Sequence, residues 1–69
     1  MRNFFQVPPV GARIKLLSMP DDPDPIPFGS LGTVLNVYND PDFAQIHVAW
    51  DNGRSLALIP GTDRWMVVS

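Results

Sequence analysis

The 69-residue sequence contains no cysteine and no glutamate, and it has a single histidine. Without cysteine there is no disulfide and no thiolate zinc site. No apolar run approaches the roughly 18 residues that a membrane-spanning helix needs, and the first residues lack the long apolar core of a signal peptide. We therefore expect a soluble, cytoplasmic domain that does not associate with membranes.

Positive charge is also scarce. Five lysines and arginines face seven acidic residues, all aspartate, so the formal net charge is −2 and the pI is about 4.8. This balance argues against a nonspecific phosphate binder, which usually carries a basic stripe. Aspartates, eight prolines and five glycines favour many short elements and little helix. We expect an extended lead-in over residues 1–10 and one small domain over residues 11–69, with a thin core.

The clearest pattern is a β-hairpin over residues 45–61, with its turn at Asp51-Asn52-Gly53. A two-residue turn at Asn52-Gly53 would mix polar and apolar side chains on both faces. A three-residue loop with a left-handed Gly53 gives one apolar face, because it pairs Ile46 with Leu58, Val48 with Leu56 and Trp50 with Arg54. The second register is favoured for that reason.

Three further strands are predicted at residues 12–18, 31–38 and 65–68, with turns at 39–42 and 60–63. Val34 and Val37 are three residues apart, which predicts a bulge or bend near Leu35-Asn36. Together with the hairpin, these elements predict an all-β fold, a small SH3-like barrel of about five short antiparallel strands. The predicted core consists of Ile14, Leu16, Val34, Val37, Ile46, Val48, Leu56, Leu58 and Val67.

Residues 19–30 form a long loop, Met-Pro-Asp-Asp-Pro-Asp-Pro-Ile-Pro-Phe-Gly-Ser. Its four prolines favour a stiff, irregular path, with Ile26 and Phe28 as expected anchors onto the core. Loops of this length are usually functional or mobile. In the lead-in, Phe4 and Phe5 could either cap the core or pair with another copy of the chain.

Four segments, at residues 13–16, 19–27, 32–34 and 46–61, resemble domain-of-unknown-function family 4314, a family of small bacterial and phage domains. The resemblance extends from Gly11 to Val68. It implies the SH3-like plan, and it implies no particular activity, because none is established for the family.

Catalysis is not expected. The only histidine, His47, lies in mid-strand on the outer face, and no cysteine or glutamate is present to build a nucleophile–base pair. Asp21, Asp22 and Asp24 lack the ligand spacing, central glycine and terminal glutamate of a calcium-binding EF-hand loop. We therefore expect no enzyme activity, no metal and no cofactor.

A protein- or peptide-binding module fits the sequence best. In SH3 domains an acidic loop lies beside an aromatic groove that receives proline-rich, basic segments. The candidate binding residues are Asp21, Asp22, Asp24, Phe28, Tyr38, Trp50 and Arg54. Core positions are the alternative for both tryptophans, Trp50 and Trp65.

The second hypothesis is a nucleic-acid or ribonucleoprotein accessory domain of KOW-like type. Gly32-Thr33-Val34 is similar to the strand start of such barrels, and Arg13, Lys15 and Arg64 could form a weak basic patch. The acidic loop opposes this hypothesis because it would repel phosphate. The sequence leaves the partner and the oligomeric state open.

Overall fold

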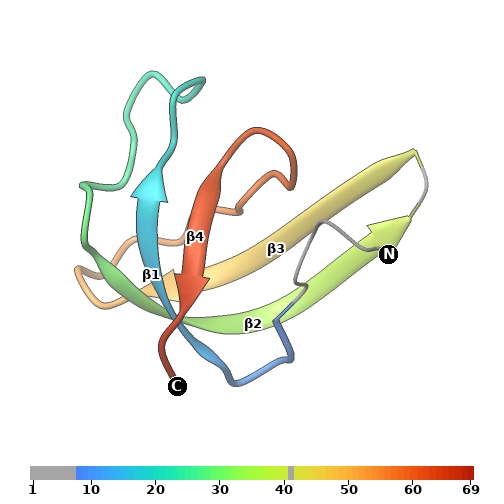
Figure 1. Ribbon diagram of the computed structural model, residues 1–69, viewed down its shortest axis with the longest axis horizontal. Coiled ribbons are helices and arrows are strands. Elements are labelled where there is room, and N and C mark those ends of the chain that lie inside the picture. The colour runs from blue at the N-terminus through green and yellow to red at the C-terminus, as the bar shows by residue number, and fades with distance from the viewer. Residues whose placement is uncertain (1–7, 41) are drawn as a thin grey trace.

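The chain is described by a computed structural model that defines residues 8–40 and 42–69. These residues form four strands and no helix: β1 (Arg13–Ser18), β2 (Leu31–Asp40), β3 (Phe43–Trp50) and β4 (Arg64–Val67). The strands make one antiparallel sheet in the order β3-β2-β1-β4 (Figure 1). The all-β prediction is confirmed.

Strand β2 contains the predicted irregularity. The β2–β3 register shifts between Val34, opposite Val48, and Asn36, opposite His47, so Leu35 has no partner across the ladder. One extra residue on one strand resets the alternation of side chains. Val34 is consequently buried and Val37 also packs against the core. β2 then continues to Asp40, so the connection to β3 is shorter than the predicted turn at 39–42.

The hairpin has the predicted register. Ile46 pairs with Leu58, and Ala49 pairs with Ser55. The N–H of Gly53 donates to the Trp50 carbonyl at 2.9 Å, and the N–H of Trp50 donates to the Arg54 carbonyl, also at 2.9 Å. Gly53 has a φ of 93°. These are the contacts of a three-residue loop closed by a left-handed glycine, and the two-residue alternative is wrong.

The arm after the turn, residues 54–59, pairs with β3 only through isolated bridges. In a regular ladder the Leu56 carbonyl would accept a hydrogen bond from the Val48 N–H. It accepts the indole N–H of Trp50 instead, at 3.0 Å. The described residues therefore form a four-stranded sheet that does not close, and the predicted count of five strands in a barrel is not reproduced.

Most of the predicted core is buried. Ile14, Leu16, Val34, Ile46, Val48 and Leu58 are each at most 1% exposed, and Val37 and Leu56 pack against them half-buried. The prediction for Val67 is wrong, since this side chain is 40% exposed. Val67 ends a four-residue strand at the edge of the sheet, so no further strand covers it.

Four more side chains complete the core: Ala12, Met19, Ile26 and Trp50. Trp50 reaches its place because β2 has a glycine beside it. A Cβ on Gly32 would lie 2.8 Å from the Trp50 ring and 2.6 Å from a Val48 methyl carbon. The absence of a side chain at Gly32 therefore allows both residues to pack directly on the β2 backbone.

Of the two expected loop anchors, Ile26 is confirmed and Phe28 is wrong. Ile26 is 2% exposed, whereas Phe28 is 75% exposed. Phe28 occupies a turn in which the Ser30 N–H donates to the Pro27 carbonyl at 3.1 Å, and Gly29 has a φ of 86°. Residues at the corner of such a turn point away from the sheet.

The predicted lead-in lies largely outside the described residues, including Phe4 and Phe5. Within the described part, Pro8 is fully buried and Val10 is 63% exposed. Gly11 joins this segment to β2, because its N–H donates to the Val34 carbonyl at 2.8 Å.

Candidate functional site

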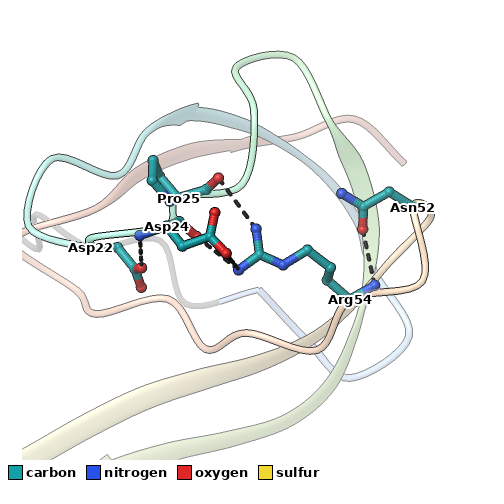
Figure 2. A network of polar contacts seen from close by, with 5 residues as sticks. All are labelled: Asp22, Asp24, Pro25, Asn52 and Arg54. Carbon is teal, nitrogen blue, oxygen red and sulfur yellow. Dashed lines mark hydrogen bonds and ion pairs between the residues drawn. The ribbon is translucent and has the colours of Figure 1, made fainter.

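The side chain of Arg54 joins the hairpin turn to the 19–30 loop. Its guanidinium donates to the carbonyl oxygens of Asp24 at 2.7 Å and Pro25 at 3.3 Å, and it lies 3.5 Å from the Asp24 carboxylate (Figure 2). The Asn52 side chain accepts the N–H of Arg54 at 3.0 Å and fixes the turn from which this side chain departs. We call this set of contacts the Arg54 clamp.

The loop is also held from within. The Asp22 side chain accepts the N–H of Asp24 at 2.8 Å, which is the local turn that aspartate favours. Ile26 fixes the following residues to the core. The three aspartates of the loop consequently lie in two different places. Asp24 faces Arg54 with its side chain 87% exposed, while Asp21 and Asp22 line a separate hollow.

This hollow, which we call the acidic hollow, lies between the 19–30 loop and the turn at 59–63. Figure 1 shows the loop after β1 rising beside the turn before β4. The hollow has a volume of about 220 Å³ and opens to solvent. Its acidic lining consists of Asp21, Asp22 and Asp63, and its apolar lining of Leu56, Ala57 and Ile59. Gln45 and Thr62 complete it.

Asp63 is the buried member of the lining, with 8% exposure. Its Oδ2 accepts the N–H of Ile59 at 2.8 Å, and the Ile59 carbonyl accepts the N–H groups of Thr62 and Asp63 at 3.0 and 2.9 Å. Burial raises the pKa of the Asp63 carboxyl above its ordinary value. The Ile59 hydrogen bond lowers this pKa, and the negative charges of Asp22 and Asp21 raise it further.

Sequence reasoning identified residues 60–63 as a turn and missed Asp63 as part of a site. The available signal was its position four residues after Ile59, where a short carboxylate side chain can return to the backbone N–H at the start of the turn. Burial of this side chain depends on segments distant in the sequence, so nothing local indicated it.

The aromatic candidates do not form the predicted groove. Trp50 is 3% exposed and belongs to the core, because its ring packs on β2 and its N–H is satisfied by Leu56. Phe28 points to solvent from its own turn. Tyr38 is 49% exposed on the β2–β3 ribbon, where its ring meets that of His47 edge-on at 5.1 Å. Tyr38 also pairs with Gln45, so it stands on the strand pair that borders the acidic hollow.

Arg13, a member of the predicted basic patch, is engaged with other side chains. Its guanidinium donates to both carboxylate oxygens of Asp51, at 2.9 and 2.6 Å, and to the Thr33 hydroxyl at 2.9 Å. The hydrogen bond from Arg13 is the main reason that the pKa of Asp51 is lowered, and the same bond raises the pKa of Arg13. The contact joins β1 to the hairpin turn.

Within residues 8–40 and 42–69, no group of three or more histidine or aspartate side chains is arranged to hold a metal ion. No helix capable of crossing a membrane occurs in this part of the chain either. The arrangement at the acidic hollow instead offers carboxylate acceptors next to apolar side chains, which suits an organic cation.

Comparison with known proteins gives one result. No curated protein and no solved structure matches the chain at a significant level. A family model matches residues 2–68, nearly the whole chain, and its extent agrees with the sheet, the loop and the hairpin described above. The chain therefore belongs to the family described as domain of unknown function DUF4314.

Proposed function

We propose that this domain is a small non-enzymatic module that binds a protein or peptide partner through a basic segment. The observation that carries the proposal is the acidic hollow, where Asp21 and Asp22 from the loop meet the buried Asp63 beside apolar side chains. Carboxylates at a binding surface attract a basic partner and raise its association rate. Neighbouring apolar side chains add burial that does not depend on charge.

The surroundings of His47 support a function without catalysis. Its Nε2 lies 3.1 Å from the Gln45 side-chain oxygen, and its ring packs against Tyr38. A catalytic histidine would instead contact a nucleophile or an orienting carboxylate. The partner is thus expected to be bound and not chemically changed.

The distribution of charge favours a protein partner over nucleic acid. Arg13 is paired with Asp51, and Arg54 with Asp24. Pairing reduces the positive charge that either arginine could present to phosphate, on a chain whose net charge is already −2.

The SH3-like barrel is part of the same proposal, as is a bacterial or phage cytoplasmic setting. The bridges of Ile46 with Leu58 and Ala49 with Ser55 support the barrel, because they place the arm after the hairpin turn along the outer edge of β3. The resemblance of the sequence to small bacterial and phage domains supports the setting.

Two charge-neutralising double variants test the binding proposal. Asp21→Asn with Asp22→Asn removes two charges from the acidic hollow. Asp40→Asn with Asp42→Asn removes two charges from the far end of the β2–β3 ribbon and is a close control, because each pair contains one aspartate that accepts a nearby backbone N–H. Fluorescence anisotropy would measure binding to a labelled lysine- and proline-rich peptide and to single-stranded RNA and DNA.

We expect the Asp21/Asp22 variant to weaken peptide binding about fivefold or more, and added salt to weaken the binding of the parent. The Asp40/Asp42 variant should change peptide binding less than twofold. Equal weakening by both variants, or no peptide binding by the parent, would refute the proposal. Nucleic-acid binding that grows stronger in the Asp21/Asp22 variant would establish the second hypothesis instead.

A further inference from the structure

We propose that the acidic hollow receives one lysine side chain of the partner, with the aliphatic stem against the apolar lining and the ammonium among the carboxylates. This inference rests on the proposed function and specifies which group of the partner enters the site. Three observations support it: the size of the hollow, its partly acidic and partly apolar lining, and the burial of Asp63.

The size of the hollow suits a side chain. Its volume of about 220 Å³ is far more than one water molecule requires, which is on the order of 10–15 Å³. It is smaller than the ~300–1,000 Å³ of pockets that hold cofactors or drug-sized ligands.

The lining has two chemically different parts. Leu56, Ala57 and Ile59 offer apolar surface, while the carboxylates belong to the loop and to the turn before β4. A lysine has the matching division, because its four-carbon stem is apolar and its ammonium carries three hydrogen-bond donors. A bare metal ion would gain nothing from the apolar part, and the described side chains form no metal-binding group.

Asp63 is the independent feature that distinguishes this site from a cluster of solvated aspartates. The residue is 8% exposed, and it lines the hollow. Within the described residues, its only hydrogen bond is the one from Ile59 to Oδ2, which leaves Oδ1 without a partner. A carboxylate can accept further hydrogen bonds, and the three donors of an ammonium would supply them.

The charges around Asp63 favour the same ligand. Burial and the nearby charges of Asp21 and Asp22 raise the pKa of Asp63, so the domain by itself opposes ionisation of this carboxyl. A cation among the three carboxylates would relieve that repulsion. Binding should therefore be tighter above the raised pKa of Asp63 than below it.

The test uses a short peptide, acetyl-Gly-Gly-Lys-Gly-Gly-amide, and two analogues. One analogue carries acetyl-lysine, which keeps the stem and removes the charge. The other carries diaminopropionate, which keeps a charge on a shorter stem. Titration of the full chain, followed through the NMR amide signals of Ala57, Ile59 and Thr62, reports on the hollow directly. We expect affinity to fall about tenfold with acetyl-lysine and about fivefold with diaminopropionate.

Two variants complete the test. Asp63→Asn keeps an oxygen that can accept the Ile59 N–H but removes the charge, and it should weaken binding of the lysine peptide about tenfold. Ala57→Leu fills the hollow without changing any charge. It should abolish the changes in the NMR amide signals that the lysine peptide causes. Ala44→Leu, on β3 outside the hollow, is its control and should bind as the parent does.

The inference is refuted if the acetyl-lysine peptide binds as well as the lysine peptide, or if Ala57→Leu leaves binding unchanged. Should Asp63→Asn fail to fold, Ala57→Leu and the peptide series still decide the matter. Failure here can be separated from failure of the proposed function. A basic peptide that still responds to the Asp21/Asp22 variant, while Ala57→Leu has no effect, would show surface attraction without insertion.

Discussion

At the scale of single residues, aspartate side chains stabilise turns and, in one case, join a turn to a strand. Asp22 and Asp63 each accept a backbone N–H inside a turn, and Asp51 accepts both guanidinium donors of Arg13. These carboxylates differ in their surroundings. Burial raises the pKa of Asp63, whereas the hydrogen bond from Arg13 lowers the pKa of Asp51, so the two groups should change the stability of the domain with pH in opposite directions.

The pH dependence of stability should separate these two residues. The folded state raises the pKa of Asp63, so the stability from this group is present below its unfolded pKa of ~3.9 and is lost as pH rises through the folded value. The folded state lowers the pKa of Asp51, so its contribution is present above the unfolded pKa and is lost as pH falls through the folded value.

Urea unfolding between about pH 2 and pH 7 measures this directly. Relative to the parent, Asp63→Asn should gain stability as pH rises, and Asp51→Asn should lose stability as pH rises. If both differences had the same sign, one of the two assigned environments would be wrong.

Gly53 permits a test of backbone strain alone. Its φ is 93°, and a Cβ added there would meet nothing within 4 Å. A substitution should therefore destabilise the domain through backbone strain and not through a steric clash with other residues. Gly53→Val should destabilise the domain by about 1 kcal/mol or more, and Gly53→Asn by less, because asparagine tolerates the left-handed region. Equal urea midpoints for the two variants would contradict this account.

At the scale of elements, a few contacts hold the 19–30 loop against the rest of the domain. Ile26 fixes it to the core and the Arg54 clamp fixes it to the hairpin turn. The guanidinium of the clamp donates to carbonyl oxygens of the loop. Loss of the clamp should therefore increase opening of the loop more than it lowers the free energy of unfolding of the domain.

Arg54→Lys should loosen the loop without unfolding the domain. Lysine keeps the charge but lacks the planar fork that reaches two carbonyls at once. Hydrogen exchange of the Asp24 amide, which the Asp22 side chain protects, should accelerate about tenfold. Arg64→Lys, on the exposed edge strand β4, is the control and should leave this rate unchanged. Equal rates in the two variants would show that the clamp does not hold the loop.

At the scale of the whole molecule, a thin core sets a small margin of stability. Apart from Pro8, the fully buried side chains come from β1, β2, β3 and the arm after the hairpin turn, so one truncation affects packing between several of these segments. The edge strand β4 contributes mainly Trp65, which packs against this cluster half-buried.

Two leucines allow the same chemical change inside and outside the core. Leu58 is 0% exposed and Leu17 is 37% exposed. Leu58→Ala should cost about 2–5 kcal/mol and could unfold the domain, whereas Leu17→Ala should cost about 0.5 kcal/mol. Thermal and urea unfolding would measure both. Similar losses would mean that the assigned core face of the hairpin is wrong.

The pattern of apolar and polar residues predicted those features that depend only on residues close together in the sequence. The hairpin register follows from alternating side chains and from Gly53, and the bulge at Leu35 follows from the spacing of Val34 and Val37. Both are settled by side-chain periodicity, which is a property of consecutive residues. The sequence by itself therefore determined the strands of the sheet, the hairpin turn and most of the core.

Only the tertiary structure decided how the arm after the hairpin and the acidic residues are used. The Trp50 ring fits beside β2 because Gly32 has no side chain. From there its indole N–H donates to the Leu56 carbonyl, which is then not used in a regular ladder with β3, and residues 54–59 do not form a fifth strand. Asp63 becomes buried and joins Asp21 at one hollow, although more than forty residues separate them. Burial and charge at such places depend on segments that folding brings together, and no window of neighbouring residues contains that information.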